Sequence, residues 1–510
     1  MMSIPLTSFA RIMKKTLIAL LIAAALPLSA QATPSFVSAS KLWTHSHDPL
    51  NTETNKSEIP AYDAKTNTLW VAGVGGVDVL NAQTGARMQR IDVSTTGSVN
   101  SVSIKNGVAA FAIESSNRTS PGVVQLFDTQ SRTLMAGGNI TVGALPDMLT
   151  FTPDGKRLLV ANEGTPSTYG ARIGTTTPRS YAPAANDPQG SVSIIDIATR
   201  SVTTATLNGV TETGALLRKN TGMDFEPEYI AVNKTGTKAY VGLQEANGMG
   251  VLNLLTNTFE KIIGLGAKDF SASGNEIDPR NNGTVAFGSY AAKGLYMPDG
   301  MATFQAGGKT YVVMANEGDF REDDADRSAA SSLGATGDLS NLRVANDLSS
   351  SGNLYAAGAR SFSIRDEDGN LIYDSGAILD KEAAKRGIYD DGRSRDKGVE
   401  PEGVTILEIG GRTFAFIGLE RTTKSAVAVF DITDPETSKY VDMIVSDGDL
   451  SPEGLIAYGN ENGYFLAVAN EVSDTTSLFR LNFVPEPGSL ALALGGLGLV
   501  GWSRRLRSTR

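Results

Sequence analysis

A short recurring phrase constrains the fold more than any other feature of the sequence. Each copy starts with Pro and an acidic residue, continues through two apolar segments separated by a polar turn, and ends in Glu. Five clear copies are LPDMLTF with KRLLVANEG, EPEYIAV with TKAYVGLQE, MPDGMATF with KTYVVMANEGD, EPEGVTIL with RTFAFIGLE, and SPEGLIAY with YFLAVANE. Two weaker copies precede them, SEIPAYD with TLWVAGVGG and NSVSIKNG with VAAFAIE, which raises the count to seven. Repeated units of this length, without long helical patterns between them, indicate an all-β repeat architecture.

Seven such units predict one seven-bladed β-propeller over residues 33–483. The last unit offers only the strands GLIAY, YFLAVAN and SLFRLNF before the chain reaches its C-terminal tail. Residues 35–43 (SFVSASKLW) alternate apolar and polar side chains, as a strand does. We therefore expect this N-terminal strand to complete the last blade and close the ring, which removes an exposed sheet edge.

The two ends of the chain have the character of targeting segments. Residues 1–32 combine Lys14 and Lys15, an apolar run and the small-residue site Ala30-Gln31-Ala32, which predicts a signal peptide cut after Ala32. The expected partners are the Sec translocon and signal peptidase. At the other end, Gly488 to Trp502 form an apolar stretch that predicts a short helix. Because this stretch is shorter than the roughly 20 residues of a stable membrane span, membrane contact is expected only transiently and only through the terminal segments.

The tail also carries a motif. Val484, Pro485, Glu486 and Pro487 precede the apolar stretch, and Arg504, Arg505 and Arg507 follow it. This order over residues 484–510 resembles the PEP-CTERM sorting signal of Gram-negative bacteria. The resemblance implies recognition by an exosortase, insertion of the tail into the inner membrane, its removal, and release or attachment at the cell surface or in the extracellular matrix.

Charge and rare residues exclude several functions. The full chain has a net charge of −10; without the predicted signal peptide and tail it keeps 38 basic and 54 acidic residues, near −16. Such a surface disfavours nucleic acid and favours cations. Cys is absent and His45 and His47 are the only histidines, which argues against thiol chemistry, a Ser/His/Asp triad and a multi-histidine zinc site. The two histidines could bind a metal from one face of a strand, but an ordinary surface strand is the favoured interpretation.

The repeated carboxylates are the main candidates for a site. The first strand of a propeller blade lines the channel and the second runs back, so strand-one starts and strand-two ends share one mouth. The strand-one starts are Glu58, Asp147, Glu228, Asp299, Glu402 and Glu453. The strand-two ends are Glu114, Glu163, Glu245, Glu317, Glu420 and Glu471. Two carboxylates about 6 Å apart repel by roughly 3 kcal/mol at an effective dielectric constant of about 20, so this rim needs compensation.

Two interpretations of the rim stay open. In the first, a subset binds Ca²⁺, which prefers oxygen ligands; the candidates are Glu163, Glu228, Asp299, Glu317, Glu402, Glu420, Glu453 and Glu471. Basic residues near the mouth, Arg393, Arg395, Lys397 and Arg421, are expected to compensate the rim as partners of its acids or, if the protein is an enzyme, to contact its substrate. In the second, the acids are structural ties that accept hydrogen bonds from neighbouring blades.

Two further segments carry many acids. Residues 319–360 include REDDADRS and a Ser/Gly/Asn-rich stretch, which predicts a mobile acidic loop. The segment RDEDGNLIYDS contains Asp366, Asp368, Gly369 and Asp374, but it departs from the spacing of an EF-hand calcium loop. It is interpreted as a hairpin with a turn at Asp368-Gly369.

A family resemblance covers nearly the whole region between the two ends. The segments RSRDKGVEPEGV, TILEIGGRTFAFIGLERTTKSAVAVFDITDP, DGDLSPEGL and FLAVANEVSDTTSLFRL resemble the choice-of-anchor I domain of bacterial surface proteins. The resemblance implies a surface protein that is paired with a C-terminal sorting signal. Two functions are expected: a non-catalytic surface or matrix protein that binds calcium or a partner such as an extracellular polysaccharide, or a metal-dependent phosphoester hydrolase, as the phosphatase-like and phytase-like labels of some relatives imply.

Overall fold

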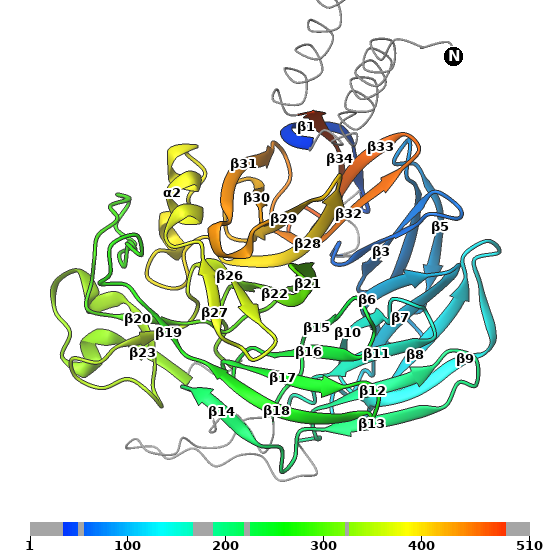
Figure 1. Ribbon diagram of the computed structural model, residues 1–510, viewed down its shortest axis with the longest axis horizontal. Helices are drawn as coiled ribbons and strands as arrows, with labels where there is room; N and C mark the ends of the chain where they lie inside the picture. The colour runs from blue at the N-terminus through cyan, green and yellow to red at the C-terminus, as the bar shows by residue number, and fades with distance from the viewer. Residues whose placement is uncertain (1–33, 49–55, 167–186, 219–224, 322–325, 486–510) are drawn as a thin grey trace, which may run out of the picture. The chain divides into compact units, whose positions relative to one another are not determined.

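The computed structural model describes residues 34–48, 56–166, 187–218, 225–321 and 326–485 (Figure 1). The chain divides into a larger unit, residues 38–408 and 413–482, and a smaller one, residues 1–37, 409–412 and 483–510. The predicted signal peptide and C-terminal apolar helix lie outside the described residues. Within the described ranges, no helix is long and apolar enough to cross a membrane.

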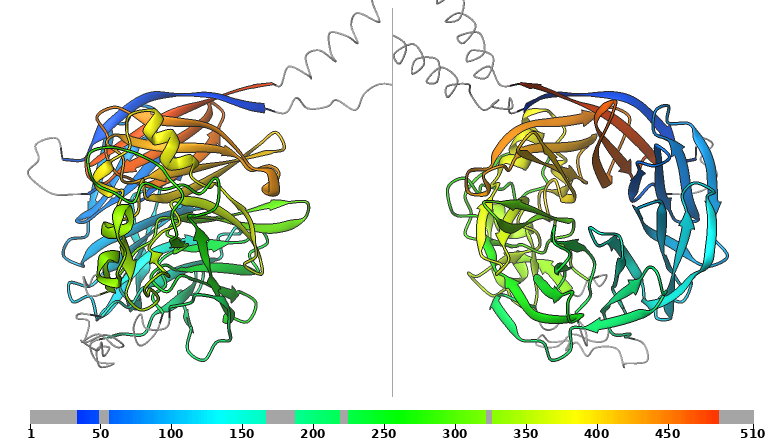
Figure 2. Two further views of the ribbon diagram at one scale, coloured as in Figure 1. Left: turned by 90° about the vertical axis from the view of Figure 1, so that its left-hand side faces the viewer. Right: turned by 45° about the vertical axis from the view of Figure 1, so that its right-hand side comes forward.

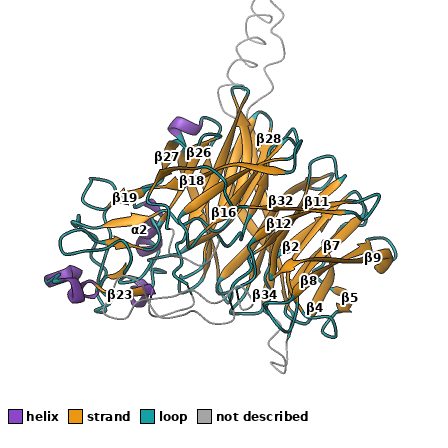
Figure 3. Cartoon of the chain, turned by 90° about the horizontal axis from the view of Figure 1, so that it is seen from below, coloured by secondary structure: helices purple, strands orange, loops and turns teal. Residues whose placement is uncertain are grey.

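The prediction of an all-β fold is confirmed, since strands dominate the described chain and helices are short (Figure 3). Over those ranges the strands form seven sheets of four or five members. The first contains β2 (Pro60–Asp63), β3 (Thr68–Gly73), β4 (Gly76–Asn81) and β5 (Arg87–Asp92). The second contains β6 (Ser98–Lys105), β7 (Val108–Glu114), β8 (Pro121–Asp128) and β9 (Thr133–Ala144). The third contains β10 (Pro146–Phe151), β11 (Arg157–Asn162), β12 (Ser191–Asp196) and β13 (Val202–Thr206).

The remaining four sheets repeat this pattern with additions. The fourth contains β15 (Ile230–Val232), β16 (Lys238–Leu243), β17 (Gly248–Asn253), β18 (Thr258–Leu265) and, parallel to β18, β14 (Glu212–Ala215). The fifth contains β21 (Met301–Ala306), β22 (Lys309–Asn316), β26 (Ser361–Asp366) and β27 (Leu371–Asp374). The sixth contains β28 (Pro401–Ile409), β29 (Arg412–Leu419), β30 (Ser425–Asp431) and β31 (Lys439–Ser446). The seventh contains β32 (Pro452–Asn460), β33 (Gly463–Asn470), β34 (Thr475–Pro485) and β1 (Pro34–Ser46).

Within the larger unit, successive sheets follow one another around a common centre (Figure 2). The first strands of neighbouring sheets are in contact: β32 with β2, β2 with β6, β6 with β10, β10 with β15, and β15 with β21. The start of each sheet therefore faces the centre, which is where the repeated acidic residues were expected.

Strand β1 forms the outer edge of the seventh sheet, next to β34. Within the larger unit, the Thr44 and Ser477 hydroxyls lie 2.7 Å apart, and the Asn482 side chain donates to the Ser38 hydroxyl at 3.1 Å. The backbone amide of His47 also donates to the carbonyl of Asp474 at 3.0 Å. In the smaller unit, Phe36 and Phe483 pack edge to face with ring centroids 5.7 Å apart.

The core consists of apolar layers between adjacent sheets. Trp70 and Phe111 pack between the first and second sheets, and Leu69 and Phe465 pack between the first and seventh. All six residues of β3 are buried, because the strand has a neighbouring sheet on each face. Fully burying one large apolar side chain is worth about 1.5–3 kcal/mol. The continuous apolar strands of the repeated phrase follow from this double burial.

The prediction of a mobile acidic loop is wrong for residues 326–360. They form β23 (Arg327–Ala329), β24 (Arg343–Ala345), β25 (Tyr355–Ala356) and the 3₁₀ turns η2 (Ala330–Leu333) and η3 (Gly337–Asn341). With β19 (Ala267–Asp269) and β20 (Lys293–Leu295), these elements enclose a core that includes Leu342 and Val344. Part of the segment's acidic charge serves structure, because Arg218 Nη2 lies 2.8 Å from Asp326 and its Nε 3.1 Å from Asp347.

The second acidic segment folds as the sequence indicates. The hairpin predicted at Asp368-Gly369 joins β26 to β27, where Gly369 has a φ of +80° and its amide donates to the carbonyl of Asp366 at 3.0 Å. After β27 the chain forms α2 (Ile378–Lys385). The 3₁₀ turn η4 (Asp391–Arg393) follows α2, and η5 (Pro435–Thr437) lies between β30 and β31.

Candidate functional site

The repeated acidic residue lies at an irregularity at the start of the first strand. In the third sheet the pairing register shifts between Pro146 and Leu149, and in the seventh between Pro452 and Leu455. Asp147 and Glu453 follow the two prolines inside these bulges. A β-bulge changes the direction of a side chain. In the second sheet the same shift, between Val99 and Ser101, encloses Asn100, so a neutral amide takes the place of the acid there.

These side chains line a central cavity of about 410 Å³ in the larger unit. The acidic residues around it are Glu58, Glu114, Asp147, Glu163, Glu228, Glu245, Asp299, Asp319 and Glu453. A second cavity of about 40 Å³ shares Asp299 and Glu453 and adds Glu402. Carboxylates in or next to strands of all seven sheets therefore gather at the centre.

The end of the second strand in the fourth sheet differs from the sequence expectation. The amide of Glu228 donates to Gly242, and that of Asp299 donates to Ala315, at 3.1 and 3.0 Å. Glu317 stands two residues after Ala315, and Gln244 stands two residues after Gly242. Gln244, and not Glu245, therefore occupies the position in the fourth sheet that Glu317 has in the fifth. The Gln244 amide group donates to Glu317 at 2.9 Å.

One side of the central region has its own cations. Lys397, in the loop between α2 and β28, places Nζ 2.5 Å from Glu317, 3.0 Å from Glu400 and 3.7 Å from Asp319. Arg393 Nε lies 2.5 Å from Glu400. Burial alone would raise the pKa of Glu400, but Lys397 and Arg393 hold it below its usual value. This cluster is a buried network of charge-assisted hydrogen bonds.

The remaining basic candidates also pair with acids. Arg421 Nη2 lies 2.6 Å from Glu420, whereas Arg395 is placed apart from this network, with Nε 3.9 Å from Asp396. A cation that the sequence did not single out, Lys56, lies 2.6 Å from Glu471. Three of the eight metal candidates, Glu317, Glu420 and Glu471, are thus neutralised within the protein.

The other five metal candidates have no such compensation. Across the described residues, no ion pair forms with Glu163, Glu228, Asp299, Glu402 or Glu453, and no backbone amide donates to their side chains. The same holds for Glu58 and Asp147 at the cavity wall. Burial, and then the charge of Asp147, raises the pKa of Glu58 to about 8. Burial and neighbouring acids also raise the pKa of both Asp147 and Asp299 to about 7.

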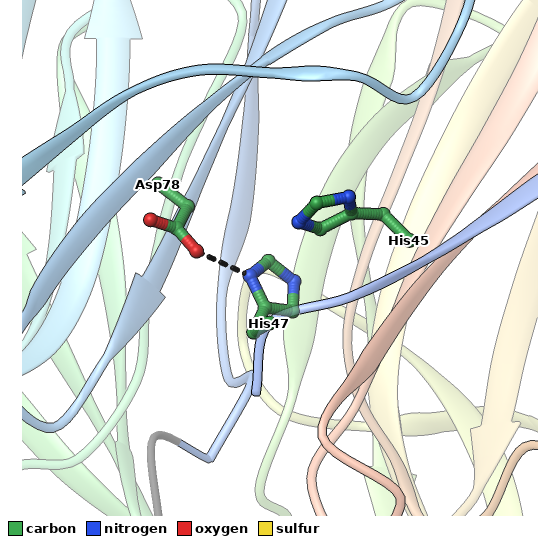
Figure 4. A group of neighbouring side chains, drawn as sticks. All are labelled: His45, His47 and Asp78. Atoms are coloured by element: carbon green, nitrogen blue, oxygen red, sulfur yellow. Dashed lines mark hydrogen bonds and ion pairs between the residues drawn. The ribbon is translucent and has the colours of Figure 1, made fainter. Parts of the chain in front are cut away.

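The two histidines do not lie on an ordinary surface strand. His47 is buried: Nδ1 lies 2.8 Å from Asp78 and Nε2 2.8 Å from the Thr476 hydroxyl. Figure 4 shows the His47 ring between Asp78 and His45, and the two imidazole centroids lie 4.9 Å apart. Burial lowers the pKa of His45 to about 4. Arg87 and Arg90 lie within 3.5 Å of Asp78, so the carboxylate already has cationic partners.

Comparison with known families identifies the larger part of the chain. Residues 58–435 match the choice-of-anchor I domain. The chain belongs to the choice-of-anchor I family. In this choice-of-anchor I protein the match begins at Glu58, the first of the repeated acids, and ends before β32 of the seventh sheet. Residues 483–508 match the PEP-CTERM protein-sorting motif. Its residues Val484 and Pro485 end strand β34, while Glu486 and Pro487 lie outside the described residues.

No curated protein matches the chain. Among solved structures, the chain is similar to Kuenenia stuttgartiensis hydrazine synthase, with a TM-score of 0.49 and 11% sequence identity. The similarity covers 85% of this chain and 97% of that one.

Proposed function

We propose that this choice-of-anchor I protein is a secreted, exosortase-sorted surface or matrix protein that binds calcium ions in an acidic central cavity. The observation that carries the proposal is a set of carboxylates around the cavity, half-buried except for the buried Glu228, that form no ion pair and accept no backbone amide. Burying an ionised carboxylate without a partner is costly, so such a group either takes up a proton or binds a cation.

The proposed scaffold is a seven-bladed β-propeller that β1 closes. Two observations support it: the seven sheets follow one another around a common centre, and β32 of the seventh sheet contacts β2 of the first. Closure by pairing strands from both termini protects the edge of the last sheet. A closed ring is a rigid support on which acids from different sheets keep a fixed spacing.

Calcium fits the donor set of the cavity. Ca²⁺ takes six to eight oxygen ligands at about 2.3–2.6 Å. The uncompensated candidates Glu163, Glu228, Asp299, Glu402 and Glu453 offer only oxygen. One oxygen of Asp299 and one of Glu402 lie within 4.8 Å of each other. Bound calcium would replace the protons that the raised pKa values favour.

The proposed role outside the cell is binding. Export through the Sec translocon and processing by an exosortase would deliver the protein to the surface or matrix of a Gram-negative cell. There, calcium at the cavity mouth would bridge the protein to the acidic groups of an extracellular polysaccharide. The PEP-CTERM match supports the exosortase step of this route.

Titration of the mature protein with Ca²⁺ after EDTA treatment tests the proposal. We expect heat of binding and a rise in the thermal unfolding temperature, both reduced in Glu453→Gln. Glu461→Gln is the control, since Glu461 is an exposed residue of the turn between β32 and β33. Absence of calcium binding in the wild-type protein would contradict the proposal.

The alternative function, a metal-dependent phosphoester hydrolase, has less support. Phosphate binding at this site would need free cationic side chains, but Arg393, Lys397 and Arg421 already pair with Glu400, Glu317 and Glu420. Incubation of the calcium-loaded protein with a panel of phosphomonoesters tests this alternative. Turnover that Glu402→Gln abolishes while the protein stays folded would favour the hydrolase.

A further inference from the structure

A group of three carboxylates at the border of the third and fourth sheets differs from the rest. Glu163 follows β11, Glu245 follows β16, and Glu226 precedes β15. One carboxylate oxygen from each lies within 4.8 Å of the other two. Glu226 was not a sequence candidate because it stands before the proline of the phrase FEPEY, not after it.

Glu226 supplies the second, independent observation. Its exposed fraction is 5%, and neither carboxylate oxygen has a hydrogen-bond partner. Oε2 of Glu245 is also buried without a partner. A buried polar atom without a partner costs about 1–3 kcal/mol, and more when it is charged. These three oxygens are therefore the least satisfied acceptors of the group.

A similar triad, with a cation bonded to two of its acids, occurs elsewhere in this chain. Glu317 follows β22, Glu420 follows β29, and Glu400 stands before Pro401. One carboxylate oxygen from each lies within 4.8 Å of the other two. Lys397 Nζ reaches two of these acids, Glu317 and Glu400. Glu226 stands before Pro227 as Glu400 stands before Pro401.

The charges around the first triad do not reproduce this arrangement. Burial and the charges of Glu245 and Glu163 raise the pKa of Glu226 well above its usual value. The charge of Asp187 adds to this rise, and the charge of Arg321 opposes it. Four carboxylates thus face the Arg321 guanidinium, and Arg118 opposes the raised pKa of Glu163. In addition, burial and the charge of Glu245 raise the pKa of Glu228 well above its usual value, which brings a fifth acid to the border.

The chemistry of the three residues suits a hard cation with flexible coordination. Ca²⁺ takes six to eight oxygen ligands at about 2.3–2.6 Å in flexible geometry, whereas Mg²⁺ demands near-ideal octahedral geometry at about 2.0–2.1 Å and usually keeps several of its waters. Three carboxylates whose oxygens lie within 4.8 Å of one another can therefore act together as calcium ligands. Zinc prefers nitrogen and sulfur ligands, which these residues do not offer.

The elements around the triad hold its acids in place. Arg218 donates to the backbone carbonyl of Glu245 at 2.9 Å, and its own amide donates to the carbonyl of Ala246 at 2.8 Å. The Thr165 hydroxyl donates to the Glu163 carboxylate. Fixed ligands lose little freedom when an ion binds.

We propose that Glu163, Glu226 and Glu245 hold one Ca²⁺ ion, which takes the place that the Lys397 ammonium has in the second triad. The inference rests on the proposed calcium-binding function and assigns its tightest site. An ion there would link the end of β11 to the segment before β15, and so tie the third sheet to the fourth.

Calorimetric titration of the EDTA-treated mature protein with CaCl₂ tests the assignment. We expect Glu226→Gln to lose one equivalent of bound calcium or to weaken the tightest site by at least about tenfold. Glu453→Gln, on the far side of the cavity, should keep that site, and Glu461→Gln should match the wild-type protein within about twofold. Far-ultraviolet circular dichroism reports whether each variant folds. If Glu226→Gln does not fold, Glu163→Gln gives the same readout.

The outcomes separate the site from the function. Calcium binding that is unchanged in Glu226→Gln and Glu163→Gln but lost in Glu453→Gln would overturn this site and leave the proposed function standing. No binding to the wild-type protein would overturn both. Equal affinity for Mg²⁺ would overturn the choice of calcium.

Discussion

His47 Nδ1 lies 2.8 Å from Oδ2 of Asp78, and this contact joins the end of β1 to strand β4 of the first sheet. The other ring nitrogen lies 2.8 Å from the Thr476 hydroxyl on β34. One imidazole thus connects the N-terminal strand, the last strand of the chain and the first sheet. The side chains of His47 and Asp78 are 1% and 0% exposed, so water cannot replace these hydrogen bonds.

We expect His47→Ala to lower the free energy of unfolding by about 1–3 kcal/mol, the cost of leaving buried partners unsatisfied. Arg87 and Arg90 still contact Asp78 and limit the loss. Ser46→Ala, at an exposed position of the same strand, is the control. Urea unfolding followed by circular dichroism measures both. Equal unfolding midpoints for the two variants would show that the His47 contact does not stabilise the fold.

Lys397 is expected to be more important for stability than a surface lysine. In Lys397→Met the buried acids Glu317 and Glu400 lose their ammonium partner, and removing one member of a buried ion pair costs about 3–5 kcal/mol. Lys424→Met is the control, because Lys424 pairs with Asp447 at 2.6 Å on the surface, where water screens the charges. Differential scanning calorimetry should show a large drop in the unfolding temperature for Lys397→Met and no drop for Lys424→Met.

Arg218 is expected to anchor the insertion before β26 to the fourth sheet. Its side chain is 0% exposed and bonds to both Asp326 and Asp347. In Arg218→Met both acids lose this partner, so residues 326–347 should open before the sheets do. Limited proteolysis measures this: we expect cleavage there at least about tenfold faster than in the wild-type protein. Cleavage at the wild-type rate would show that apolar packing alone holds the insertion.

The sequence was sufficient for the strands and for much of the acidic site. The repeated phrase predicted the strands because each copy combines a proline at a strand start, two apolar segments buried on both faces and a polar turn. It also predicted that Asp147 and Glu453 lie at the central site. Both follow the proline of the phrase, and a β-bulge at this proline orients their side chains.

Contacts between distant segments could not be predicted in this way. Lys397 meets Glu317 across 80 positions, and His47 meets Thr476 across 429. Whether Gln244 or Glu245 occupies the repeated position at the end of β16 depends on a register difference of one residue. Hydrophobic patterning does not resolve such a difference. Glu226 and Glu400 had one available signal: both precede the proline in EPE, the only two copies of the phrase with acids on both sides.

The metal-free protein should become less stable as the pH rises from about 4 to about 8. The pKa of Glu58 is about 8 and that of both Asp147 and Asp299 about 7 in the folded protein, against ordinary values near 4. The folded state therefore binds protons more tightly than the unfolded chain. Each such group removes at most about 1.4 kcal/mol per pH unit between its two pKa values. Below pH 4 the effect reverses, because the lowered pKa values of Glu400 and Asp78 then cost stability.

Calcium should abolish this slope, since the ion replaces the protons of the cavity acids and stabilises their charged form. Urea unfolding between pH 4.5 and 8.5, in EDTA and in saturating CaCl₂, measures the free energy of unfolding under both conditions. In EDTA, Glu58→Gln should reduce the slope of the free energy of unfolding against pH by the contribution of one carboxylate, because glutamine does not titrate. A metal-free protein whose stability rises over this range would show that the cavity acids are already ionised in the folded state.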